Sequence, residues 1–199
     1  MRIHLSGAAL AALLVMLSPL GGAKADGFTY FDRGPVPALV ELGVGAFAPF
    51  DPAGEGHHGT GSTALFQLDG ISRWEIVNFW NYFIVNPYVG GFATGKGGAM
   101  GYGGIHGTVP IGPHFEADPF FAVGGYERGS GRDMGGTALF QTGLSLLYVF
   151  DSGYRAGATF SHESNGTLLP RERAGCVCNP GANNFMLTVG VPFVKIVNF

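Results

Sequence analysis

The chain is poor in charge and, beyond its first residues, has no long apolar run. Lysine, arginine, aspartate and glutamate together make up 13% of the 199 residues, and the formal net charge is −3. The chain therefore lacks the basic surface that nucleic-acid binding requires. Past residue 25, glycine, proline or a polar side chain interrupts every apolar run within a few residues, which excludes a membrane-spanning helix.

Glycine and aromatic residues are plentiful instead. The chain has 35 glycines and 17 phenylalanines, and 46% of its residues are hydrophobic. No Gly-X-Y period accompanies the glycines, so the chain is not collagen-like. Glycine weakens helices and aromatic residues favour strands, so this composition indicates an all-β protein and argues against a helical bundle.

The first 25 residues have the pattern of a secretory signal peptide. Arg2 and His4 form a short polar start, residues 8–17 are apolar, and Ala23-Lys24-Ala25 supplies the small-x-small cleavage pattern. The apolar stretch is too short to span a bilayer as a helix. We therefore expect a signal peptide at 1–25 and one domain at 26–199. Such an exported chain is either a soluble β-domain or an outer-membrane barrel.

Eight strand candidates follow, several of them long enough to cross a bilayer at a tilt. Turn-forming residues separate them, and the tightest separator is Asp151-Ser152-Gly153. The aromatic-rich region 70–84 fits either an interfacial girdle or part of a strand. The expected strands lie near residues 38–49, 62–73, 82–94, 98–110, 115–127, 135–150, 153–165 and 184–197.

Side chains alternate along these strands between an apolar face and a small or polar face. In 184–197, for example, Phe185, Leu187 and Val189 share one face. A barrel turns the apolar face outward and a soluble sandwich turns it inward, so alternation alone leaves both open. The last residue, Phe199, favours the barrel, because it resembles the C-terminal aromatic residue by which outer-membrane proteins are recognised for assembly. We therefore predict an eight-stranded antiparallel transmembrane β-barrel of the outer membrane, with a periplasmic turn at 151–153 and an extracellular loop at 166–183.

His162 and Ser164 are the most informative pair. Two residues apart on a strand, they share a face, with Cα atoms roughly 6.5–7 Å apart. That spacing lets an imidazole and a hydroxyl approach hydrogen-bond distance, the minimal arrangement of a base-activated nucleophile. Both continue the apolar face that a barrel turns toward lipid. The alternative is that they are polar rim residues where the strand leaves the membrane.

The stretch from Pro119 to Phe193 resembles the lipid A 3-O-deacylase family of outer-membrane proteins. The most specific part is the motif His162-Glu163-Ser164-Asn165 with the downstream Asn179-Pro180-Gly181. Further matches are Phe121-Ala122-Val123-Gly124-Gly125-Tyr126, Gly129-Ser130-Gly131-Arg132-Asp133-Met134-Gly135 and Val191-Pro192-Phe193.

The resemblance implies a serine esterase that removes the 3-O-linked acyl chain from lipid A of lipopolysaccharide in the outer leaflet. Ser164 would be the nucleophile and His162 the general base. Asn179 would help to hold the oxyanion, with Asn165 and Gly181 supporting the site. The chemistry requires no metal and no cofactor. Whether the barrel forms a homodimer is left open by the sequence.

The chain departs from the family at the third member of the triad, because Asn183 stands where a glutamate is expected. An amide can orient a histidine, as in Cys-His-Asn proteases, but it does not stabilise the imidazolium as a carboxylate does. Glu172 is an alternative acid, whereas Glu163 points to the opposite face. A second interpretation is therefore a catalytically weak or inactive family member that acts as a structural or adhesive barrel.

The remaining cysteine and histidine residues suggest no further site. Cys176-Val177-Cys178 fits a strained disulfide somewhat better than free or intermolecular thiols. His57-His58 lies in a glycine-rich stretch and is expected to be solvated. His106 and His114 are isolated in the sequence, so we predict no metal site.

Overall fold

The computed structural model describes residues 37–49, 62–166, 172–173, 176–177 and 181–193, with 172–173 and 176–177 described by their backbone alone. Within these residues, eight long strands form the body of the molecule and three short strands lie outside it. The long strands are β1 (Leu39–Phe47), β2 (Thr63–Ile71), β4 (Phe83–Thr94), β5 (Ala99–Ile111), β6 (Phe115–Glu127), β7 (Ala138–Val149), β8 (Arg155–Ser164) and β11 (Ala182–Pro192). The short ones are β3 (Val77–Phe79), β9 (Glu172–Arg173) and β10 (Cys176–Val177).

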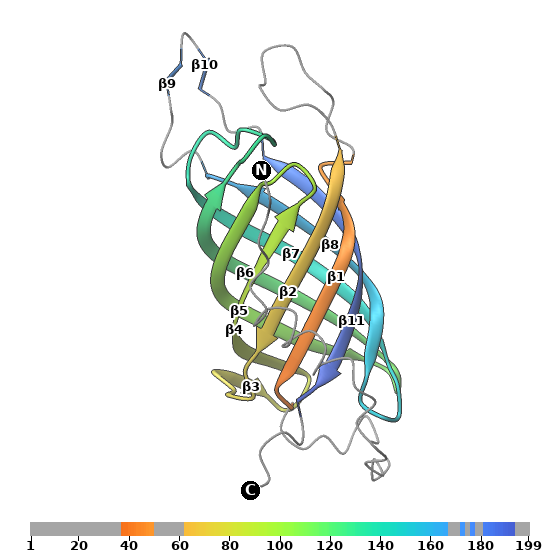
Figure 1. Cartoon of the computed structure of the whole chain (residues 1–199). Coiled ribbons are helices and arrows are strands. Elements are labelled where there is room, and N and C mark those ends of the chain that lie inside the picture. Colours follow the sequence, from red (N-terminus) through yellow and green to blue (C-terminus); the bar gives the residue numbers. More distant parts are fainter. Residues whose placement is uncertain (1–36, 50–61, 167–171, 174–175, 178–180, 194–199) are drawn as a thin grey trace, which may run out of the picture.

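The eight long strands close into an antiparallel barrel (Figure 1). Neighbours in the chain are neighbours in the sheet, β2 pairs with β4, and β1 pairs with β11 to join the two ends. This architecture confirms the predicted fold. In the part of the chain that the structure describes, no helix is long and apolar enough to cross a membrane.

The expected strand positions agree closely with the observed ones, with two informative differences. The last strand begins at Ala182, two residues earlier than expected, because Gly181 adopts a φ of +57° and starts the strand there. This extension places Asn183 within the sheet. The aromatic region 70–84 contains the short strand β3, which pairs in a hairpin with the first residues of β4, so part of the region is strand, as one interpretation expected. The interfacial girdle stays a prediction.

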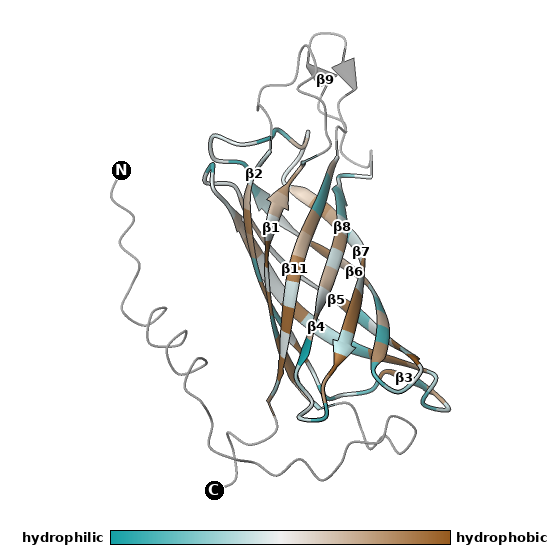
Figure 2. Ribbon diagram, turned by 90° about the vertical axis from the view of Figure 1, so that its right-hand side faces the viewer, coloured by the Kyte–Doolittle hydropathy of each residue, from teal (hydrophilic) through white to brown (hydrophobic). Residues whose placement is uncertain are grey.

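The apolar face of the sheet points outward and the polar face points into the barrel, which excludes the soluble sandwich. Figure 2 shows the resulting alternation of hydrophobic and hydrophilic residues along the strands. Water-soluble monomers rarely expose a contiguous apolar surface of this extent, so the belt is built to face lipid. Its exposed members include Val44, Phe66, Leu68, Val89, Ile105, Phe121, Val123, Leu144, Leu146, Phe160, Phe185, Leu187 and Val189.

The lumen is filled by side chains, as expected for a barrel of eight strands. Aromatic rings pack in the half of the lumen that contains the end of β1 and the end of β4. The ring centroid of Phe92 lies 5.9 Å from that of Phe47 and 6.5 Å from that of Tyr102. Charged groups are buried in it as well. Arg155 Nε lies 2.7 Å from Glu116 Oε1, and both side chains are almost completely buried.

The two ends of the barrel differ in their connections. At one end, which we call the turn end, the strands are joined by residues 72–82, 112–114 and 150–154. At the other, which we call the loop end, they are joined by residues 48–62, 95–98, 128–137 and 165–181. Short turns are typical of the periplasmic side of outer-membrane barrels. At the turn end, the β3 hairpin projects sideways from the barrel (Figures 1 and 2) and exposes Trp74, Phe79, Trp80 and Tyr82.

Candidate active site

The candidate site lies at the loop end of β8, where consecutive side chains point to opposite sides of the barrel wall. His162 and Ser164 are on the outer face and are half-buried, whereas Glu163 between them is completely buried in the lumen. The period of two along a strand produces this separation. The structure thus places the two expected reactive groups on the lipid-facing side, as the sequence predicted.

Asn183 lies directly beside His162 on the neighbouring strand. The two residues are register partners between β11 and β8, and His162 Nδ1 is 2.9 Å from Asn183 Oδ1. An amide oxygen can only accept a hydrogen bond, so this contact requires a proton on Nδ1. In the neutral ring, Nε2 then carries a lone pair and is free to accept a proton.

Gly181 fixes the other side of the imidazole. A Cβ atom at this position would lie 2.8 Å from His162 Cε1 and 3.3 Å from Nε2, and the residue has a φ of +57°. Both the left-handed backbone and the close ring favour glycine here. Asn183 of β11 therefore contacts the ring of His162, and Gly181, just before β11, leaves room for it.

Glu163 belongs to a hydrogen-bonded network inside the barrel. Its carboxylate accepts hydrogen bonds from Gln141 Nε2 at 3.1 Å, from Ser161 Oγ at 2.7 Å and from the amide of Asn184. A buried carboxylate needs such donors. With these partners on the lumen side, Glu163 does not take part in the outward-facing site.

Asn165 also points inward and ties the candidate site to a neighbouring loop. It is buried, and its amide donates a hydrogen bond to the backbone oxygen of Met134 at 3.1 Å. Met134 lies in the connection between β6 and β7 and is itself buried. The observed role of Asn165 is therefore to anchor the end of β8 to the 128–137 connection.

Aromatic side chains surround the outward-facing pair. Phe160 and Phe185 are register partners that lie two residues closer to the turn end than His162 and Asn183, and both are exposed. On the other flank, Phe140 is the register partner of Ser164 and stacks with Phe121 at a centroid distance of 5.9 Å. The polar pair thus sits at the edge of an apolar, aromatic surface.

Several expected site residues lie outside the described part of the structure. Asn179, Cys178 and His57-His58 are not described, and neither are the side chains of Glu172 and Cys176. Their proposed roles stay predictions.

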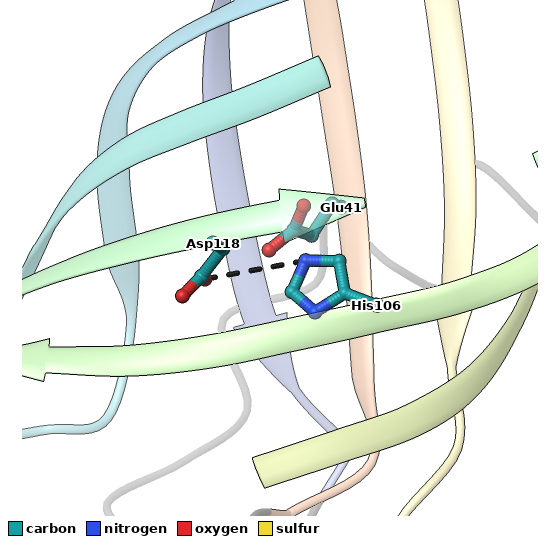
Figure 3. Close-up of side chains that lie close together, drawn as sticks. All are labelled: Glu41, His106 and Asp118. Atoms are coloured by element: carbon teal, nitrogen blue, oxygen red, sulfur yellow. Dashed lines mark ion pairs between the residues drawn. The ribbon is translucent and has the colours of Figure 1, made fainter. Parts of the chain in front are cut away.

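The structure also brings together a group of residues that the sequence did not reveal. His106, which seemed isolated, lies in the lumen with Glu41 and Asp118 (Figure 3). The three residues come from β1, β5 and β6, and only the barrel register makes them neighbours. The sequence does contain one indication of this cluster, because Glu41 and Asp118 are charged residues within predicted membrane strands. Charged residues in a membrane span usually need a partner.

Comparison with known proteins gives two relevant similarities. The family model for lipid A 3-O-deacylase (PagL) matches residues 67–192. The crystal structure of the outer membrane enzyme PagL is similar with a TM-score of 0.58 and 17% sequence identity, over 78% of this chain and 100% of that one. At this identity, the structural likeness supports the fold alone.

A weaker likeness is to the backbone structure of the Yersinia pestis outer membrane protein Ail in a phospholipid bilayer nanodisc. It has a TM-score of 0.45 and 10% identity, over 79% of this chain and 99% of that one. No curated protein sequence matches the chain significantly.

Proposed function

The chain belongs to the lipid A 3-O-deacylase (PagL) family, and on that premise we propose that it is an outer-membrane serine esterase that removes the 3-O-linked acyl chain of lipid A. In this proposal Ser164 is the nucleophile, His162 is the general base and Asn183 orients His162. The observation that carries the proposal is the 2.9 Å contact between His162 Nδ1 and Asn183 Oδ1 on the lipid-facing side of the barrel.

The chemistry follows from the orientation of the imidazole. Because Nδ1 donates to Asn183, Nε2 is the nitrogen that can take the hydroxyl proton of Ser164 as its oxygen attacks the ester carbonyl. The protonated ring then returns the proton to the leaving 3-hydroxyl of the lipid, and an acyl-enzyme remains. Water, activated by the same imidazole, releases the fatty acid. Asn179 is proposed to donate to the oxyanion during both steps.

Asn183 is compatible with this cycle but makes it weaker. In serine proteases, replacing the triad aspartate by asparagine lowers the rate about 10⁴-fold, largely because the histidine adopts the wrong tautomer. Here the amide oxygen, not the amide nitrogen, faces Nδ1, and this is the arrangement that the productive tautomer needs. What the amide lacks is the negative charge that stabilises the imidazolium. We therefore propose a slow enzyme, with Glu172 as an alternative third member.

The aromatic surface supports a lipid as the substrate. Phe160 and Phe185 lie next to His162 and Asn183 on the exposed face, on the side of the turn end. An acyl chain in the outer leaflet would run along the barrel there. An ester located at the boundary between acyl chains and headgroups would then reach Ser164. In this proposal the enzyme acts on lipid A in place, without extracting it from the membrane.

The test is release of fatty acid from lipopolysaccharide. The protein would be refolded in detergent, mixed with lipopolysaccharide, and the released 3-hydroxy fatty acid measured by mass spectrometry over several hours. We expect slow release by the wild type and none by Ser164→Ala. Ser161→Ala is the matched control, because it removes a hydroxyl from the lumen side of the same strand. Equal release by wild type and Ser164→Ala would refute the proposed nucleophile.

The second candidate function is a structural or adhesive barrel without esterase activity. The observation favouring it is the amide at position 183 in place of a carboxylate. It predicts that the wild type releases no fatty acid while Asn183→Asp or Asn183→Glu does. Slow release by the wild type would exclude it.

Export through a cleaved signal peptide completes the proposal. Residues 1–25 carry the pattern for it, and the barrel fold requires delivery to the outer membrane. Mass spectrometry of the protein isolated from outer membranes should give a mature chain that begins at Asp26. An intact Met1 in that fraction would contradict cleavage.

A further inference from the structure

We propose that Glu41, His106 and Asp118 bind a divalent metal ion, best matched by Zn²⁺, inside the barrel. The three side chains point toward one another from β1, β5 and β6 (Figure 3). One donor atom from each lies within 4.8 Å of the other two. Ligands around a tetrahedral zinc ion are separated by about 3.3 Å, so shifts of about 1 Å would bring all three onto one ion.

The imidazole nitrogens of His106 and Oε1 of Glu41 have no hydrogen-bond partner among the described residues. His106 and Asp118 are 3% and 0% exposed. The separation of 4.0 Å between His106 Nε2 and Asp118 Oδ2 is too long for a hydrogen bond. Buried polar groups in proteins are almost always satisfied, so groups left in this state call for a ligand.

The local charge also favours a dication. The buried ion pair of Arg155 and Glu116 lies near the cluster, and Arg155 interacts electrostatically with Glu41 and with Asp118. With the three carboxyl groups of Glu41, Glu116 and Asp118 ionised, as metal binding requires of its ligands, the single guanidinium leaves two formal negative charges in this buried region. A metal ion of charge +2 bound to a neutral His106 balances them. Uncompensated charge in a membrane span is otherwise strongly unfavourable.

The mixed donor set narrows the choice of ion. Imidazole nitrogen suits zinc and other transition metals, whereas Mg²⁺ and Ca²⁺ prefer sites made only of oxygen. One nitrogen and two carboxylate oxygens provide three of the four ligands of a zinc ion. Glu41 and His106 also line an internal cavity beside the cluster, which has room for about one water molecule. That water would be the fourth ligand.

Bound there, the ion would link strands that lie on opposite sides of the lumen. β1 is the strand that closes the barrel against β11, and β5 and β6 lie across from it. Gly190 of β11 lies between Glu41 and Arg155, and a Cβ there would lie 3.2 Å from Arg155 Cβ and 3.4 Å from Glu41 Oε1. The role we assign to the ion is structural and is independent of the esterase proposal.

The experiment measures zinc retained by the refolded barrel. The chain carrying Cys176→Ser and Cys178→Ser, which removes thiol ligands, would be refolded in detergent without lipopolysaccharide and with one equivalent of Zn²⁺. After gel filtration in the presence of a weak chelator, zinc would be counted by plasma mass spectrometry. We expect close to one ion per barrel and a higher temperature of unfolding than for the zinc-free barrel, read from heat-modifiable migration on gels.

Variants locate the ion. Asp118→Asn and His106→Asn should each lower zinc retention at least ten-fold and abolish the thermal shift. Glu163→Gln is the matched control: it removes another buried lumen carboxylate, one already bonded to Gln141 and Ser161 and outside the cavity lining, and should retain the ion. Co²⁺ in place of Zn²⁺ should give a visible absorption band that His106→Asn abolishes.

Two results would overturn the proposal. The first is the absence of both retained zinc and a thermal shift in the parent chain, a result that needs no variant to fold. The second is equal zinc retention by the parent and the folded Asp118→Asn barrel, which would place the ion elsewhere.

Discussion

Asn183 and Asn184 are consecutive in β11, yet their side chains bond to groups on opposite sides of the barrel wall. Asn183 Oδ1 accepts from His162 on the lipid-facing side, and the amide of Asn184 donates to Glu163 in the lumen. Their partners are themselves consecutive in β8. The wall is one strand thick, so the candidate site and the interior network are built from the same two strands without sharing a side chain.

The charge at position 183 should control the rate of the proposed esterase. Asn183→Asp is isosteric and keeps the contact with His162 Nδ1 while adding a negative charge beside the imidazolium. We expect release of 3-hydroxy fatty acid to rise by well under about 10⁴-fold, because only the missing charge, and not the tautomer, is corrected. Asn183→Leu should lower it, and Glu172→Ala should leave it unchanged. A loss with Glu172→Ala and no change with Asn183→Leu would make Glu172 the third member.

Gly181 should be needed for the position of the His162 ring. In Gly181→Ala, the added Cβ would lie 2.8 Å from His162 Cε1, so the ring must move and activity should fall at least ten-fold. The control is Gly112→Ala, which has a φ of +74° but no atom within 4 Å of the added Cβ. Both variants should lose about 1–2 kcal/mol of stability from the left-handed backbone. An equal loss of activity in both would show that strain alone is responsible.

Glu163 should matter for stability and not for chemistry. In Glu163→Ala, the donors of Gln141, Ser161 and Asn184 lose their acceptor in a buried environment. Each unsatisfied buried group costs about 1–3 kcal/mol, so the midpoint of urea unfolding should fall clearly. Glu163→Gln keeps an acceptor oxygen and should lose less. The rate per folded molecule should stay within about two-fold of wild type if the triad does not use this residue.

The two arginine–carboxylate pairs should differ in their contribution to stability. Arg155 and Glu116 are 4% and 0% exposed at a separation of 2.7 Å, whereas Arg128 and Asp133 are 44% and 25% exposed at the same separation. Arg155→Met leaves a buried carboxylate without its cation and should destabilise the barrel by about 3–5 kcal/mol. Arg128→Met should change the free energy of unfolding by less than about 1 kcal/mol. Similar losses for both would mean that water reaches the lumen pair.

The β3 hairpin should lie at the membrane interface. The only two tryptophans of the chain, Trp74 and Trp80, are 75% and 77% exposed, and both lie on this hairpin. Tryptophan partitions to the headgroup level of bilayers. In vesicles, lipids carrying a quencher near the headgroup should therefore reduce the fluorescence more than lipids carrying it at the chain ends. The opposite order would place the hairpin in the hydrocarbon core, and no quenching would place it in water.

Strand number and the facing of residues could be predicted from the sequence, because both follow from local alternation. The apolar face of β11 and the opposite orientation of His162 and Glu163 were expected from period two alone. Whether the apolar face of the sheet points outward, as in a barrel, or inward, as in a sandwich, could not be derived from this alternation. It depends on whether charged residues such as Glu41 and Asp118 point into the closed lumen, as they do here.

Cross-strand neighbours were less predictable than faces, because register depends on how the barrel closes. The pairing of His162 with Asn183 was anticipated only through the family resemblance, since the expected last strand began after Asn183. The cluster of Glu41, His106 and Asp118 was missed, because its members come from three strands and their spacing in the sequence has no recognisable pattern.

The thin wall of the barrel has an evolutionary consequence. On β8 and β11, a substitution on the outer face changes chemistry and one on the inner face changes folding, so selection can act on the two separately. Exchange of a carboxylate for an amide at position 183 leaves every lumen contact of Glu163 intact. If the proposed esterase is correct, a lineage can slow it, or restore its speed, through single mutations that the folding of the barrel does not oppose.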